Sequence, residues 1–144
     1  MATRGQLTGM QAVFLVAAEL SARGFIVTTT SRNAMGADLL VTDPHCQRTW
    51  SIQVKANRKP ASFWLVGEKS LTTQSPSHVY VFVNLRPADG KHEYYIAPSR
   101  SVARRVKVVT HRRSTWYVVN KRDMVKARDR WQQFRTRVPV GTKT

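Results

Sequence analysis

The sequence has few acidic residues, one cysteine and no long apolar run. Eight Asp and Glu stand against 24 Lys and Arg, which leaves a formal charge of +16. Such an imbalance destabilises a compact chain by self-repulsion unless a polyanion relieves it. No apolar stretch approaches the length of a bilayer span, and residues 1–11 show no charged-then-apolar signal region. These absences predict a cytoplasmic protein whose partner is nucleic acid rather than a membrane.

The lone Cys46 excludes an intrachain disulfide framework and a thiolate cluster for zinc. What the chain does contain is enough for a core, because 42% of its 144 residues are hydrophobic. No repeat, low-complexity segment or linker divides it. We therefore expect one α/β domain over residues 1–144, with a mixed or antiparallel central sheet flanked by helices.

Hydrophobic spacing locates the expected elements. A helix is predicted from about residue 9 to Gly24, and its buried face is expected to carry Met10, Val13, Phe14, Ala17 and Leu20. Further helices are predicted over 99–109 and 121–134. Strands are predicted over 25–30, 37–42, 49–56, 78–85 and 92–97, and the runs 62–66 and 114–120 are compatible with short strands.

Polar side chains interrupt two of these apolar strands. Gln53 and Lys55 are two residues apart, so they share one face of their strand, while Ile52 and Val54 share the other. If strands 37–42 and 49–55 form a hairpin closed between Thr42 and Thr49, Asp38 lies directly across from Gln53. Opposite residues have Cβ atoms about 5 Å apart. A carboxylate, an amide oxygen and an ammonium group are therefore expected to converge.

Such a group suits metal-assisted hydrolysis of a phosphodiester. Carboxylate and amide oxygens bind hard cations such as Mg²⁺ or Mn²⁺, and an ammonium group can orient the nucleophile or stabilise developing charge. The alternative is an ordinary cross-strand ion pair on a solvated face. The apolar neighbours Leu39, Val41 and Ile52 favour a functional site, since they indicate a largely buried sheet.

The order of helix, strand, G-A-D-L-L-V, turn and S-I-Q-V-K resembles the core of the PD-(D/E)xK nuclease superfamily. The Q-V-K form is similar to the branch seen among homing endonucleases and Holliday-junction-resolvase-like proteins. The resemblance covers about residues 9–98. It implies a restriction-endonuclease-like fold and a Mg²⁺- or Mn²⁺-dependent endonuclease that acts on DNA, with structured or branched DNA as one candidate substrate. Many members dimerise, so a homodimer is left open.

The resemblance also implies roles for individual residues. Asp38 matches the metal-binding Asp, Gln53 the Glu or Gln ligand, and Lys55 the catalytic Lys, while the main-chain carbonyl of Val54 is a further metal ligand. Ala37 replaces the name-giving Pro, and Gln53 contributes an oxygen without charge, which weakens metal binding.

The family often adds a Glu on the first helix, but the position that aligns best holds Val13. Glu19 is the helix's acid, six residues later. It could reach the site from the edge of the buried face, but an exposed Glu near the helix end is the favoured interpretation.

The candidate nucleic-acid-binding residues lie in two places. Arg32, Asn33, Arg58 and Lys59 are expected on loops at the ends of the catalytic strands, where they would contact the nucleic acid. Between residues 100 and 137 stand thirteen Lys or Arg against two acids. There the basic C-terminal helical segment, about 121–137, is expected to place Lys126 and Arg130 against phosphates while its apolar residues pack on the sheet.

Two alternatives to an active nuclease stay open. The first is a nucleic-acid-binding module on the same fold that has lost catalysis, which Gln53 and Val13 favour. The second is a basic RNA-binding protein unrelated to nucleases, which rests on charge alone. The four tryptophans are expected in the core rather than stacked on bases.

Overall fold

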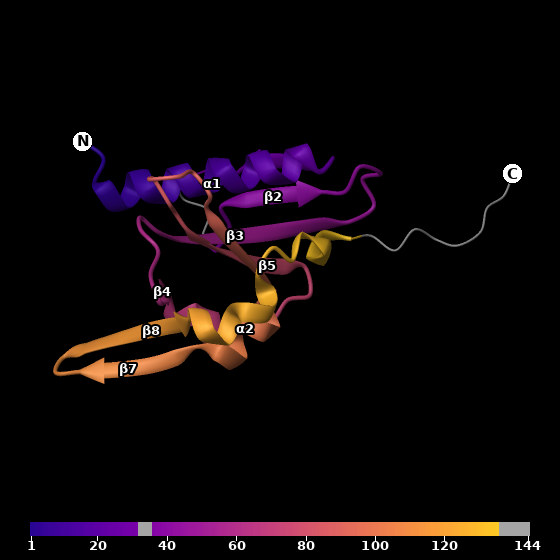
Figure 1. Cartoon of the computed structure of the whole chain (residues 1–144). Coiled ribbons are helices and arrows are strands. Elements are labelled where there is room, and N and C mark those ends of the chain that lie inside the picture. Colours follow the sequence, from indigo (N-terminus) through magenta and orange to yellow (C-terminus); the bar gives the residue numbers. More distant parts are fainter. Residues whose placement is uncertain (32–35, 136–144) are drawn as a thin grey trace, which may run out of the picture.

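The computed structural model describes residues 1–31 and 36–135, which form two β-sheets and the helices packed on them (Figure 1). A five-stranded sheet has the order β1-β2-β3-β5-β6, and a three-stranded sheet has the order β4-β8-β7. Helix α1 (Arg4–Ala22) lies along one face of the five-stranded sheet, and the three-stranded sheet with α2 (Ser99–Arg105) lies on the other side.

The larger sheet consists of β1 (Ile26–Thr29), β2 (Leu39–Thr42), β3 (Thr49–Asn57), β5 (His78–Asn84) and β6 (Glu93–Pro98). The smaller consists of β4 (Phe63–Val66), β7 (Lys107–His111) and β8 (Ser114–Asn120). Three 3₁₀ helices complete the chain: η1 (Glu68–Leu71), η2 (Lys121–Ala127) and η3 (Trp131–Phe134).

The predicted meander and its register are confirmed. Strands β1, β2 and β3 pair antiparallel, and Thr42 lies opposite Thr49. Strand β3 then pairs parallel with β5, so the sheet is mixed. The chain between β3 and β5 forms β4 and η1. Strand β4 belongs to the second sheet because it pairs with β8.

The turn between β2 and β3 is organised by a buried carboxylate. Asp43 is fully buried and accepts backbone N–H hydrogen bonds from Gln47 and Arg48, each at 2.7 Å. Burial alone would raise the pKa of this carboxyl, but the N–H donors of Arg48, Gln47 and His45 outweigh it and hold the pKa below its usual value. Asp43 therefore shapes the hairpin that sets the position of Asp38.

Helix α1 begins earlier than predicted, and its buried face differs. It starts at Arg4 because Thr3 and Gln6 form a capping box. The buried residues are Ala12, Val16 and Leu20. Met10 and Phe14, expected inside, are 42% and 58% exposed and border an open cavity beside Thr29 and Thr30.

The predicted helices of the C-terminal half are wrong in two places. Helix α2 ends at Arg105, because Val106 adopts an extended backbone (φ −65°, ψ 127°) and residues 107–111 pair with β8. The β-branched valines of this segment favour a strand. The segment over 121–134 is not one α-helix but η2 and η3 with a turn between them. The predicted basic segment extends to about residue 137, and its residues 136 and 137 lie outside the described part of the chain.

Two hydrophobic cores hold the layers together. Valines 79, 81 and 83 of β5 face α1 and η3, while Tyr80 and Phe82 on its other face pack with Trp64 and Tyr95. Both faces of β5 are therefore buried. Trp50, Trp64 and Trp131 lie in these cores as predicted, but Trp116 is 48% exposed.

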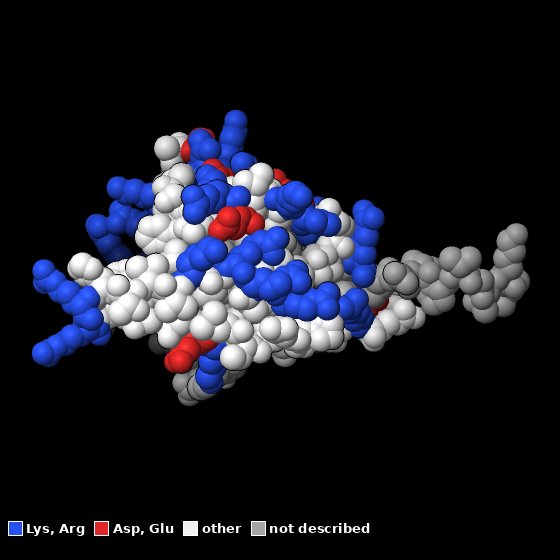
Figure 2. Space-filling view, turned by 90° about the horizontal axis from the view of Figure 1, so that it is seen from below, with Lys and Arg blue, Asp and Glu red and all other residues white. Residues whose placement is uncertain are grey.

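The side of the molecule that carries the second sheet and α2 is strongly basic. Lys and Arg side chains form a band across it, interrupted by isolated acidic groups (Figure 2). A depression of about 250 Å³ on this side is lined by α2 and η2. Its charged lining residues are Arg100, Arg104, Arg105, Asp123, Lys126 and Arg130.

Candidate functional site

The carboxylate of Asp38 lies at the point where β2 begins and β3 continues past it. Asp38 donates its backbone N–H to the carbonyl of Ile52 at 2.7 Å, which continues the hairpin ladder by one residue. Its Oδ2 accepts two hydrogen bonds, from Gln53 Nε2 at 3.0 Å and from the backbone N–H of Val54 at 2.8 Å. The juxtaposition of Asp38 and Gln53 that the hairpin register predicts is therefore present.

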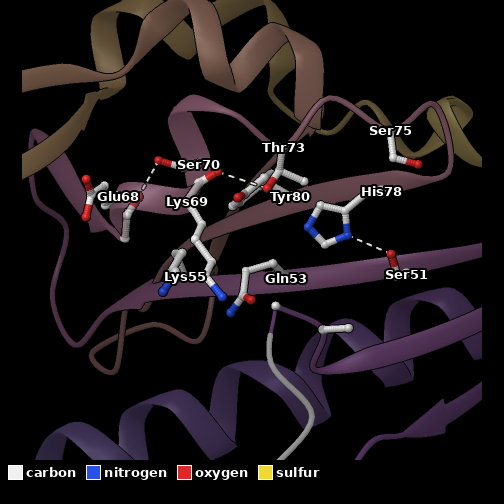
Figure 3. A pocket seen from close by; sticks show the side chains of 13 residues that line it. Ser51, Gln53, Lys55, Glu68, Lys69, Ser70, Thr73, Ser75, His78 and Tyr80 are labelled. Atoms are coloured by element: carbon white, nitrogen blue, oxygen red, sulfur yellow. Dashed lines mark hydrogen bonds between the residues drawn. The ribbon is translucent and has the colours of Figure 1, made fainter.

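Gln53 and Lys55 extend from the same face of β3 into a cavity of about 720 Å³ (Figure 3). The floor of this cavity comes from β3 and β5, where Ser51 lies opposite His78 and Gln53 opposite Tyr80. One wall comes from η1, whose Lys69 reaches toward Gln53 and Lys55. Two ammonium groups thus share the cavity with the Gln53 amide.

A second cavity, of about 500 Å³, lies on the α1 side of Asp38. Asp38, Gln53 and Val54 line it together with Val13 of α1. Gln53 borders both cavities, so the Asp38–Gln53 pair forms the partition between them. Val13 therefore faces the site. It occupies the helix position at which the superfamily pattern has an acid, and its side chain is apolar.

Glu19 does not compensate for this missing acid. It lies six residues beyond Val13, which is about 9 Å along the helix. Its carboxylate is exposed and pairs with Arg23 at 3.4 Å. The favoured interpretation of an exposed Glu near the helix end is therefore what the structure has.

Strand β5 adds a histidine and a tyrosine to the larger cavity, whose other polar lining residues include Glu68, Ser70, Thr73 and Ser75 (Figure 3). His78 Nδ1 and Ser51 Oγ are hydrogen-bonded at 2.6 Å. Burial lowers the pKa of His78 below its usual value, so its ring is neutral at pH 7. Burial raises the pKa of Tyr80, which keeps its hydroxyl protonated. Both groups act as neutral hydrogen-bonding partners.

The oxygen atoms around Asp38 are of the type that a hard divalent cation binds. Among the described residues no hydrogen bond involves Asp38 Oδ1 or Gln53 Oε1, so both are available as ligands. The N–H of Val54 points toward Asp38, and because N–H and C=O of one strand residue point to the same side, its carbonyl is on that side too. Within residues 1–31 and 36–135, however, no three His, Cys, Asp or Glu gather as metal ligands. The site fits a cation bound by oxygens with a single carboxylate.

The predicted nucleic-acid-binding residues fall into three groups. Arg58 and Lys59 are exposed in the bend that follows β3, a few residues beyond Lys55. Lys126 and Arg130 are also exposed, but they line the depression beside α2 and not the cavities at Asp38. Arg32 and Asn33 lie outside the described residues.

Sequence reasoning missed Lys69 and the pair formed by Ser51 and His78. The segment 67–77 has no strong periodicity, so its return to the end of β3 carries no signal in the sequence. His78 was assigned only to a strand, and it lies next to Ser51 because β3 and β5 pair in parallel across a long connection. Of these three residues, only Ser51 carried a signal in the sequence, because it lies two residues from Gln53 and therefore on the same face of the strand.

No helix in the described part of the chain is long and apolar enough to cross a membrane.

Comparisons with known proteins identify the fold. No protein-family model matches the chain, and no curated protein matches it in sequence. Solved structures similar to it include a homing endonuclease and a Holliday junction resolvase. A bacterial homing endonuclease, I-Ssp6803I, has a TM-score of 0.57 and 16% sequence identity, over 92% of this chain and 91% of the other. A Holliday junction resolvase from the archaeon Archaeoglobus fulgidus has a TM-score of 0.50 and 9% identity, over 78% of this chain and 91% of the other. The chain has the restriction-endonuclease-like fold that the sequence resemblance implies.

Proposed function

We propose that this protein is a divalent-metal-dependent endonuclease that hydrolyses phosphodiester bonds of DNA. The observation that carries the proposal is the convergence of the Asp38 carboxylate, the Gln53 amide and the Val54 backbone beside Lys55 at one end of β3. The net charge of +16 supports a polyanionic substrate. The two structural neighbours, a homing endonuclease and a Holliday junction resolvase, support the same class of chemistry.

Each residue of the site has a distinct role in this proposal. Asp38 Oδ1, Gln53 Oε1 and the Val54 carbonyl would hold Mg²⁺ or Mn²⁺. Gln53 must first rotate its amide, because its nitrogen now donates to Asp38. When bound, the cation supplies Lewis-acid stabilisation of the phosphoryl group. The Lys55 ammonium orients the attacking water and neutralises negative charge that develops on the phosphate.

The surrounding charges position the substrate. Lys69 on the wall of the cavity, together with Arg58 and Lys59 beyond the end of β3, would contact the phosphates on either side of the scissile bond. Lys126 and Arg130 belong to the separate basic depression, so we assign them to more distant phosphates.

The alternative is a nucleic-acid-binding module on the same fold without catalysis. The single carboxylate and the apolar Val13 favour it, because they lower the negative charge available to a metal ion. The hydrogen bond that the Val54 backbone donates to Asp38 favours the enzyme. On a non-catalytic surface, an exposed ion pair between Asp38 and Lys55 would have been sufficient.

Cleavage assays with Asp38→Asn and Lys55→Met test the proposal. The wild type is expected to cleave DNA with Mg²⁺ or Mn²⁺ and not with EDTA, and each variant is expected to lose about a hundredfold or more of the rate. Asp89→Asn and Lys91→Gln, on the exposed turn between β5 and β6, remove the same charges outside the site and should cleave like the wild type.

DNA binding measured in EDTA separates the two functions. Both site variants should bind DNA about as well as the wild type. A wild type that binds DNA but cleaves none of the linear, branched and single-stranded substrates with either metal would instead favour the non-catalytic module.

A further inference from the structure

The hairpin formed by β7 and β8 extends beyond the rest of the second sheet. Strand β4 pairs with β8 only as far as Val66 opposite Tyr117, so residues 114–116 of β8 pair with β7 alone. All five residues of β7 are exposed. At about 3.3 Å per residue, this two-stranded ribbon projects about 10 Å past β4 before its turn. It is visible as the extended arm in Figure 1.

The ribbon points to the side of the molecule where the candidate site lies. The chain leaves β4 at Val66 and immediately forms the cavity wall with Gly67, Glu68 and Lys69. The ribbon continues past β4 in this same direction, because β8 runs antiparallel to β4. In Figure 1 its turn and the C-terminal end of β3 both lie toward the left, where α1 begins.

The charge of the ribbon is entirely positive. No Asp or Glu occurs from residue 94 to residue 122, and Arg112 and Arg113 form the two-residue turn at its end. Neither arginine takes part in a salt bridge within the part of the chain that the structure describes. Arg112 has a φ of 54°, a conformation that favours Gly or Asn and costs an arginine about 1 kcal/mol or more. Strain at an arginine-bearing tip is consistent with a functional position.

The strands of the ribbon carry apolar side chains that the described part of the fold leaves about half exposed. Val108 is 53% exposed, Val109 is 48% exposed and Trp116, which lies opposite Val109, is 48% exposed. A second copy of the chain could cover these groups by pairing along β7, but it would bring two acid-free, positively charged ribbons together. Charge complementarity therefore favours a polyanion as the occupant.

We propose that the β7–β8 ribbon enters a groove of duplex DNA and positions the duplex over the candidate site. The major groove of B-form DNA is about 12 Å wide and admits a two-stranded β-ribbon. Arg112 and Arg113 contact phosphates or base edges from the tip, and Trp116 with Val109, which lies opposite it, packs on the groove wall. The deep, narrow major groove of A-form RNA excludes such a ribbon, so the partner is duplex DNA rather than duplex RNA.

This inference rests on the proposed function for its DNA partner but not on catalysis, so it is tested in EDTA. Trp116 is the exposed member of the four tryptophans, since Trp50, Trp64 and Trp131 are 0%, 1% and 7% exposed. Acrylamide quenching of intrinsic fluorescence therefore reports chiefly on Trp116. A DNA duplex should lower the quenching constant of the wild type to that of the Trp116→Phe variant, whose own constant should not change. An RNA duplex of the same sequence should protect Trp116 less.

A second measurement removes the charge at the tip. Arg112→Gln/Arg113→Gln should weaken binding to the DNA duplex about tenfold or more and reduce the slope of log K against log salt by about two. The matched control is Arg23→Gln/Arg48→Gln, which removes two charges near the opposite end of the sheet, where Gly24 approaches Pro44. That control should leave the slope nearly unchanged, and melting curves check that both variants fold.

Three results would overturn the proposal. Equal protection of Trp116 by DNA and RNA would exclude groove entry, and equal salt slopes for the tip variant and the control would exclude contact by the tip. Free wild type that is quenched no more than Trp116→Phe would show the ribbon already covered by a second copy. A protein that binds through the ribbon but cleaves nothing would refute the proposed enzyme alone, and one that cleaves normally without using the ribbon would refute this inference alone.

Discussion

Strands β5 and β7 have similar valine-rich sequences but opposite surroundings. All seven residues of β5 are buried, whereas all five residues of β7 are exposed. β5 lies between β3 and β6 with a hydrophobic core on each face, and β7 is the edge strand of the smaller sheet. Valine content therefore does not decide burial. The layers packed on each strand decide it, since β5 has a core on both faces and β7 contributes no residue to either core in the described part of the chain.

Charged side chains of the larger sheet and of the ribbon also differ in whether they have ion-pair partners. Glu93 on β6 is 5% exposed and is surrounded by cations, since Lys121 lies at 3.0 Å and Arg86 at 3.5 Å. Arg112 and Arg113 at the ribbon tip have no such partner in the described part of the chain. The charge of Glu93 is neutralised within the fold, while the two arginines at the ribbon tip are available to a partner.

The largest expected effect comes from truncating matched apolar residues in the two strands. Phe82→Ala in β5 should lower the free energy of unfolding by about 3–5 kcal/mol, because it leaves a cavity between Trp64 and Tyr95. Val108→Ala in β7 should change it by less than about 0.5 kcal/mol. Urea denaturation measures both. Comparable losses in the two variants would mean that the ribbon is packed in solution.

An intermediate effect is expected at Glu93. Burial raises the pKa of its carboxyl, but the hydrogen bond and charge of Lys121, with Asn84 and Arg128, outweigh this and hold the pKa below its ordinary value of 4.5. Glu93→Gln should therefore lower the free energy of unfolding at pH 7 by about 1–3 kcal/mol. This carboxylate links β6 to Lys121 at the end of β8, so the loss would weaken the contact between the two sheets.

The pH dependence of that difference has a definite sign. A depressed carboxyl pKa stabilises the fold above pH 4.5, and this stabilisation disappears as the pH falls through the lower pKa of the folded state. Wild type and Glu93→Gln should therefore differ at pH 7, and the difference should shrink as the pH falls below 4.5. Urea midpoints over a series of pH values measure this. A difference that does not shrink in acid would assign the effect to packing rather than to charge.

The smallest effect is expected at Gln53. Gln53→Glu replaces a donor to Asp38, 3.0 Å away, with a second carboxylate. Repulsion should lower the melting temperature in EDTA by an amount that corresponds to about 1 kcal/mol, and Mg²⁺ should restore it. Gln53→Met removes the same hydrogen bond without adding charge, so its melting temperature should not respond to Mg²⁺. A Gln53→Glu protein that is equally insensitive would argue against a metal site at Asp38.

Local pattern was sufficient for the first half of the fold. The alternation in 49–56 and the Asp43-Pro44 turn predicted a hairpin, and its register alone placed Asp38 beside Gln53. The C-terminal half was predicted less well. Residues 107–109 were placed in a helix because they follow a helix start at Ser99, and nothing local shows that β8 offers them a partner.

The sequence by itself determined the strongly basic surface, the antiparallel hairpin and the set of groups at its end, because charge, alternation and turn chemistry act between near neighbours. Only the tertiary structure decided that His78 and Lys69 join this cavity, that Val13 faces Asp38, and that β7 and β8 form an exposed ribbon. These depend on the parallel pairing of β3 with β5 and on the departure of β4 into a second sheet. Contacts between segments so far apart along the chain are selected by the burial of the two cores, which no local pattern specifies.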